Sequence, residues 1–150
     1  MSSTSTSEIY RGGCYCGRIS YAVTGKPILS AYCHCTQCQS IKAAVFSHTI
    51  HFPGSSFSWT HNAAMDVYHR KPGSDRYRCA NCGTAVACYS TESNEWSVYG
   101  GQIERDEAGK IKHWELLKPT AHIFYDTRML DVLDDLGKWD GYENSSNRIS

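Results

Sequence analysis

The stretch Cys33-His34-Cys35-Thr36-Gln37-Cys38 places three cysteines within six residues. Two further pairs flank it along the chain, as Cys14-Tyr15-Cys16 and Cys79-Ala80-Asn81-Cys82. All of these cysteines stand in C-x-C or C-x-x-C spacing, in which a short turn can present several thiolates to one zinc ion. The sequence therefore predicts metal binding at all three positions.

Disulfide bonds are the alternative use of many cysteines in a small domain. The segment Met1–Ser7 is rich in Ser and Thr and has no apolar core, so we expect no secretory signal peptide there. We therefore expect reduced thiols and a cytoplasmic location. The remaining cysteine, Cys88, lies in the apolar stretch Thr84–Tyr89 and is expected to be a buried thiol of the core.

The number of clustered cysteines suits one closed and one open zinc site. A structural zinc takes four protein ligands, whereas a catalytic zinc takes three and leaves a position for water or substrate. The simplest grouping joins the two outer pairs into an outer cluster: Cys14, Cys16, Cys79 and Cys82. It leaves three residues as a central cluster: Cys33, Cys35 and Cys38. In the alternative, a two-knuckle zinc ribbon, central cysteines pair with the last pair and the first pair has no metal.

The composition limits the kind of partner. The chain has 150 residues, and its 15 Lys and Arg balance its 15 Asp and Glu. A net charge of zero disfavours nucleic-acid and membrane-surface binding, and no apolar run reaches the roughly 20 residues of a membrane span. We expect one zinc-stabilised domain over residues 11–136, a disordered tail over 1–10 and a polar tail over 137–150. The expected partner is a small-molecule substrate.

Short alternating segments between turn residues predict a mainly β fold. Arg18–Val23 alternates polar and apolar residues, which is typical of a half-buried strand. Further strands are expected at 30–33, 44–50, 57–59, 67–69, 76–78, 84–89 and 96–99, with a hairpin turn at 106–110. One C-terminal helix is expected at Asp126–Leu136, because Met129, Leu130 and Leu133 recur at helical spacing and Gly137 can end it.

The three cysteine motifs, in this order and spacing, resemble those of the glutathione-dependent formaldehyde-activating enzymes, which share a domain with centromere protein V. The resemblance covers about residues 11–125. It implies a compact, mainly β fold, a structural zinc on the outer cluster and a second zinc on the central cluster, where glutathione and formaldehyde meet. Two zinc ions per chain are therefore expected.

The chain departs from this family at two places beside the central motif. Many members have basic residues and a glycine there, whereas Gln39–Phe46 contains Lys42 and no glycine. Arg78 stands before Cys79, where an aromatic residue is common. The ending Pro119–Ile123 resembles the P-x-x-H-I ending of many relatives.

A zinc with three thiolates is a weak Lewis acid that suits a soft substrate thiol. The expected activity is that of a carbon–sulfur lyase or synthase acting on thiol–aldehyde adducts. The alternatives are a zinc-dependent lyase, decarboxylase or isomerase acting on another metabolite, and a non-catalytic interaction module.

Candidate catalytic acids or bases are His34, beside the central cysteines, and His122, in the family-like ending. His48 and His51 fall on opposite faces of one strand, so at most one of them faces a pocket. Four residues are candidates to bind substrate carboxylates: Arg70, Lys71, Arg76 and Arg78.

Overall fold

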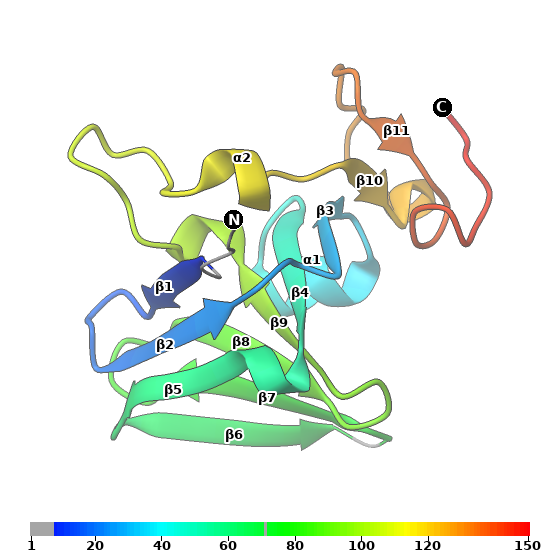
Figure 1. Cartoon of the computed structure of the whole chain (residues 1–150). Coiled ribbons are helices and arrows are strands. Elements are labelled where there is room, and N and C mark those ends of the chain that lie inside the picture. The colour runs from blue at the N-terminus through cyan, green and yellow to red at the C-terminus, as the bar shows by residue number, and fades with distance from the viewer. Residues whose placement is uncertain (1–7, 71) are drawn as a thin grey trace.

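The computed structural model describes residues 8–70 and 72–150, and its strands form two sheets (Figure 1). The small sheet is antiparallel, with strands β1 (Ile9–Gly13), β2 (Ile19–Thr24) and β5 (Phe57–Asn62) in the order β1-β2-β5. The large sheet has the order β11-β10-β3-β4-β9-β8-β7-β6. Its strands are β3 (Leu29–Cys33), β4 (Ser47–Pro53), β6 (Met65–Arg70), β7 (Ser74–Cys79), β8 (Ala85–Ser90), β9 (Glu95–Tyr99), β10 (Ala121–Ile123) and β11 (Gly137–Lys138).

Helices are few and short in the described part of the chain. They are α1 (Thr36–Lys42), α2 (Trp114–Leu117) and the 3₁₀ turns Gly54–Ser56, Gly100–Gln102 and Tyr125–Thr127. The predicted mainly β fold is confirmed. Strands were predicted at most of their observed positions, whereas α1 was not predicted.

The core lies between the two sheets and follows from alternation along the strands. Ile19, Tyr21 and Val23 of β2 are fully buried or nearly so. They share one apolar cluster with Ile50 and Phe52 of β4. Burial of this aliphatic and aromatic surface is the main favourable contribution to folding.

Because side chains alternate along a strand, the large sheet presents a different face on its other side. Thr49 and His51 of β4, together with Ser97 and Tyr99 of β9, line a cavity there. The sheet thus has an apolar face toward the small sheet and a polar face toward the cavity. This second face positions the functional site.

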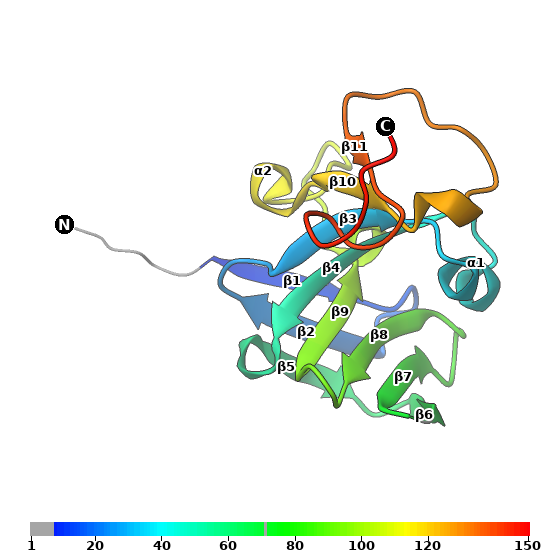
Figure 2. The same cartoon turned by 90° about the vertical axis from the view of Figure 1, so that its right-hand side faces the viewer.

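A second apolar cluster fixes the C-terminal segment beside β3. Ala31 and Cys33 of β3 pack with Ala121 and Ile123 of β10, and these two strands run parallel. Figure 2 shows β10, β11 and the C-terminal segment beside β3, at the same end of the large sheet as α1.

The predicted helix at Asp126–Leu136 is wrong. After the 3₁₀ turn Tyr125–Thr127 the segment has no regular helix, and Leu133 is 97% exposed. The Tyr125 hydroxyl accepts a hydrogen bond from the Val132 amide at 2.8 Å. The Asp134 carboxylate accepts bonds from the Leu136 amide and the Lys138 ammonium. These side-chain bonds compete with helical backbone bonds and override the helical spacing of the apolar residues.

The folded region extends beyond the predicted boundaries at both ends. Strand β1 begins at Ile9, within the predicted tail of residues 1–10, whose residues 1–7 lie outside the described part. In the predicted tail of 137–150, β11 pairs with β10, and Trp139 forms a β-bridge with Arg148. No helix among the described residues has the length and apolar character needed to cross a membrane.

Helix α1 ends at a residue whose backbone conformation favours glycine. Ala43 has φ 47° and ψ 48°, the left-handed region in which a Cβ is disfavoured. Ala43 lies between the central motif and the next strand, in the segment where the resemblance to the family leads us to expect a glycine.

Replacing Ala43 with glycine is expected to stabilise the protein by about 0.5–1 kcal/mol, because relief of the Cβ strain exceeds the extra backbone entropy of glycine. Thermal unfolding followed by circular dichroism would detect this as a higher Tm. Ala44, the next residue, is not in the left-handed region. Ala44→Gly is the matched control and is expected to lower the Tm. An equal drop for both variants would contradict the assigned strain.

Candidate metal centres and active site

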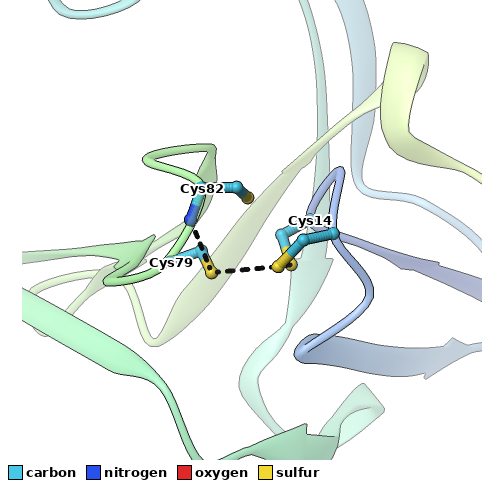
Figure 3. Close-up of side chains that lie close together, drawn as sticks. Cys14, Cys79 and Cys82 are labelled. Carbon is cyan, nitrogen blue, oxygen red and sulfur yellow. Dashed lines mark hydrogen bonds between the residues drawn. The ribbon is translucent and has the colours of Figure 1, made fainter.

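The outer cluster brings together two turns that are far apart in sequence. Cys14 and Cys16 follow β1, while Cys79 ends β7 and Cys82 lies in the turn before β8. Cys14, Cys79 and Cys82 point toward one another (Figure 3). The four Sγ atoms all lie within 4.8 Å of each other.

The geometry of the outer cluster fits a closed zinc site. Four thiolates at about 2.3 Å from zinc in a tetrahedron lie about 3.8 Å apart. The Sγ atoms of Cys14 and Cys16 are 3.7 Å apart, as are those of Cys16 and Cys79. Backbone amides of Ile19 and Cys82 donate hydrogen bonds to sulfur, at 3.3 Å to Cys14 and 3.4 Å to Cys79. Such bonds stabilise thiolates.

The central cluster is built by the end of β3 and the start of α1. Cys33 is the last residue of β3, Cys35 is the N-cap of α1, and Cys38 lies in its first turn. The Cys38 amide donates to Cys35 Sγ at 3.3 Å, and the Sγ atoms of Cys33 and Cys38 are 3.5 Å apart. The three Sγ atoms lie within 4.8 Å of one another. The structure thus groups the cysteines as four and three, and the two-knuckle ribbon alternative is wrong.

In each cluster the thiols affect one another, so that some pKa values fall while burial and neighbouring thiols raise the pKa of Cys79 in the outer cluster and of Cys33 and Cys38 in the central one. In the outer cluster, the Thr84 hydroxyl lies 3.1 Å from Cys82 Sγ, and its hydrogen bond lowers the pKa of Cys82 to about 5. In the central cluster, hydrogen bonds from Cys33 and Cys38 lower the pKa of Cys35. Zinc binds the thiolate form, and the grouping of four and three sulfur atoms within 4.8 Å of one another makes both clusters suited to the metal.

A cavity of about 810 Å³ opens beside the central cluster. Its wall is the polar face of five adjacent strands of the large sheet, in the sheet order β3-β4-β9-β8-β7. All three central cysteines line it, whereas none of the four outer cysteines does. A small molecule can therefore reach the central cluster, whereas the outer cluster only links two turns of the chain.

Lys42 lies in this cavity one helical turn after Cys38. Its ammonium is 2.7 Å from Ser47 Oγ and 3.0 Å from the centroid of the Tyr99 ring. Burial lowers the pKa of Lys42 to about 8, although nearby Cys38 opposes the shift. A lysine in this range can exchange a proton near neutral pH.

A second titratable pair lines the same cavity. His51 Nδ1 lies 3.4 Å from Glu95 Oε1. Burial lowers the pKa of His51, and the Glu95 carboxylate opposes that shift. His48 lies on the other face of β4, where its Nε2 is 2.8 Å from Ser30 Oγ. The predicted separation of the two histidines is confirmed, and His51 is the one that faces the cavity.

The predicted catalytic histidines lie together but do not line the cavity. His34 Nε2 is 2.8 Å from His122 Nδ1, and His122 Nε2 is 2.8 Å from Asp134 Oδ2. Both imidazoles are fully buried. Burial and the neighbouring His122 lower the pKa of His34 to about 4. Although burial opposes it, hydrogen bonds from His122 and Lys138 lower the pKa of Asp134 to about 2. This network links β3 and β10 to the C-terminal segment.

Of the predicted carboxylate-binding residues, some line the cavity and others do not. Arg70 and Arg76 line the cavity. Arg78 does not, and its guanidinium forms an ion pair with Asp66 at 3.1 Å. Lys71 lies outside the described residues. Sequence spacing could not separate these side chains, because their surroundings depend on which strands lie beside β7.

Comparison with known proteins identifies one family over most of the chain. The family described as glutathione-dependent formaldehyde-activating enzyme matches residues 9–127, a range that contains all seven clustered cysteines. No curated protein matches the chain significantly. The crystal structure of a Rhodobacter sphaeroides protein is similar with a TM-score of 0.49 and 17% identity, over 67% of this chain and 96% of that one. By the match to its family, this chain belongs to the glutathione-dependent formaldehyde-activating enzymes.

Proposed function

We propose that the protein is a zinc-dependent carbon–sulfur lyase or synthase that joins a substrate thiol to a small aldehyde. The forward reaction forms a bond between the thiol sulfur and the aldehyde carbon. The sulfur loses its proton and the aldehyde oxygen gains one. The product is a hemithioacetal, which for formaldehyde is an S-hydroxymethyl adduct. The reverse reaction breaks the same carbon–sulfur bond.

The observation that carries this proposal is the position of the central cluster. Its three thiols line a cavity of about 810 Å³, so a metal bound there would be open to a small molecule. A zinc ion bound by three thiolates supplies deprotonation of a soft substrate thiol near neutral pH. An interaction module has no need of such a cavity at its metal site.

The side chains of this cavity supply the remaining parts of the reaction. Lys42 lines the cavity one helical turn after Cys38, which supports a role as the donor of a proton from Nζ to the aldehyde oxygen. Leu29, Ile123 and Phe124 give part of the cavity an apolar lining against which the adduct could pack. Holding thiol and aldehyde together in this space replaces a bimolecular encounter with an oriented one.

The test is thiol-dependent turnover. The zinc-loaded protein is mixed with ¹³C-formaldehyde and glutathione, and adduct exchange is followed by NMR exchange spectroscopy. We expect the exchange rate to rise above the uncatalysed rate in proportion to enzyme concentration. A zinc-loaded protein that gives no acceleration with any thiol or aldehyde tried would refute the proposed reaction.

The role of Lys42 as general acid predicts how the rate of adduct formation depends on pH. The protonated form of Lys42 donates the proton, so adduct formation is expected to fall as pH rises through about 8. The charged or titratable groups near it are Cys33, Cys38, His51, Arg76, Cys88 and Tyr99.

Lys42→Met is expected to lower the rate by about 100-fold and to remove the decrease near pH 8. Lys42→Arg is the matched variant, because it keeps the charge but does not lose its proton in this range. It should therefore show a low rate without the decrease. An unchanged decrease near pH 8 in both variants would assign the titration to another group.

A further inference from the structure

The wall of the cavity on β7 and β8 carries donors that no group among the described residues satisfies. Ser74 and Arg76 of β7 line the cavity, directly opposite Ser90 and Cys88 of β8. Arg76 Nε and Ser74 Oγ are both buried, and neither has a hydrogen-bond partner among the described residues. A buried donor without an acceptor costs free energy, so two of them side by side indicate a place for a ligand.

The charges of the cavity point to the same wall. Among the described residues, neither Arg76 nor Arg70 takes part in an ion pair. The acidic groups of the cavity are already engaged, since Glu95 faces His51 and Glu143 accepts a hydrogen bond from Thr120. The β7 wall is therefore positive, and its two arginines have no acidic partner in the part of the chain that the structure describes.

Arg76 also reaches toward the reacting end of the cavity. Burial raises the pKa of Tyr99, the nearby positive charge of Arg76 opposes this shift, and both side chains line the cavity. The ring of Tyr99 in turn lies under the Lys42 ammonium. A chain of neighbours thus runs from Cys38 through Lys42 and Tyr99 to Arg76.

We infer that Arg76, assisted by Ser74, is the anchor for a carboxylate of the substrate thiol. A guanidinium presents parallel N–H donors that match the two oxygens of a carboxylate, and a neighbouring hydroxyl adds a third donor. The inference rests on the proposed function, because it places the thiol of the same molecule at the central cluster. It makes Arg76 a specificity-determining residue that favours acidic thiols over neutral ones.

The test compares two thiols that differ only at the carboxylate, N-acetylcysteine and N-acetylcysteine amide. Binding of each to the zinc-loaded full-length protein is measured by isothermal titration calorimetry. The wild type is expected to bind the acid at least about 10-fold more tightly than the amide, as for a hydrogen-bonded charge pair. Titration with sodium acetate reports whether any carboxylate binds without a thiol.

Three variants separate the anchor from general effects on the fold. Arg76→Met is expected to reduce the preference for the acid to less than about twofold, with the affinity for the amide unchanged. Arg76→Lys is expected to retain part of the preference, because it keeps the charge but loses the parallel donors. Arg78→Met is the matched control on the same strand, since Arg78 pairs with Asp66, and should behave as the wild type.

An equal preference in Arg76→Met and the wild type, or no preference in the wild type, would overturn the anchor. Adduct exchange with ¹³C-formaldehyde is also measured with both thiols. It distinguishes failure of the anchor from failure of the proposed reaction. Acceleration with both thiols and no preference would refute the anchor alone. A preference that Arg76→Met removes, without acceleration for either thiol, would refute the reaction alone.

Discussion

Replacing Cys82 with serine is expected to unfold the domain. The outer cluster joins the turn after β1 to the turn between β7 and β8, and Cys16 and Cys79 are 63 positions apart. A structural zinc contributes about 10–16 kcal/mol in zinc-finger peptides, whereas a whole domain is stable by about 5–15 kcal/mol. Loss of one thiolate weakens the site enough to remove most of this stability.

Circular dichroism and a fluorescence melt of Cys82→Ser would measure the effect. Cys88→Ser is the matched control, because it makes the same chemical change at a cysteine outside both clusters. We expect Cys88→Ser to melt cooperatively within a few degrees of the wild type. A Cys82→Ser protein as stable as Cys88→Ser would show that the outer cluster does not hold the fold together.

Replacing Cys35 with serine is expected to abolish the central metal and the activity while sparing the fold. Cys35 is the N-cap of α1 and accepts a hydrogen bond from the Cys38 amide. Serine is a preferred N-cap, so the helix start is kept. Two remaining thiolates hold zinc poorly, so we expect about 1,000-fold lower adduct exchange, equivalent to about 4 kcal/mol of lost transition-state stabilisation.

Metal analysis, circular dichroism and adduct exchange on Cys35→Ser would separate the two roles. Cys35→Ala should lose the same zinc and activity and, in addition, about 1 kcal/mol of stability from the missing cap. If Cys35→Ser unfolds as fully as Cys82→Ser, both clusters are structural and the cavity has no open metal site.

The three cysteine motifs were evident from local spacing, and the number of ligands that zinc takes favoured the grouping into four and three. The two-knuckle ribbon stayed open until the structure brought the two outer pairs together. The strands followed from alternation, which is local as well. Helix Asp126–Leu136 failed because its competitors are tertiary: the Tyr125 hydroxyl, His122 and Lys138 take up the polar groups of the segment. No pattern within the segment itself could reveal those partners.

The sequence was a poorer guide to which titratable side chains line the cavity. His34 and His122 were the catalytic candidates, since one adjoins the central cysteines and the other lies in a family-like ending. They bond to each other away from the cavity, because His34 alternates with its neighbours Cys33 and Cys35. A better signal was the spacing of four between Cys38 and Lys42, which places both on one helix face once α1 is known. Arg76 became distinct from Arg78 only when the partners of each guanidinium were visible.

Zinc-edge X-ray absorption together with elemental analysis tests most directly whether the protein holds one closed and one open zinc site. The wild type, purified without chelator, should contain about two zinc ions per chain with an average of about 3.5 sulfur ligands each. Cys35→Ser should contain about one zinc with about four sulfur ligands. A wild type that holds only about one zinc with four sulfur ligands, even after zinc is added, would contradict the account.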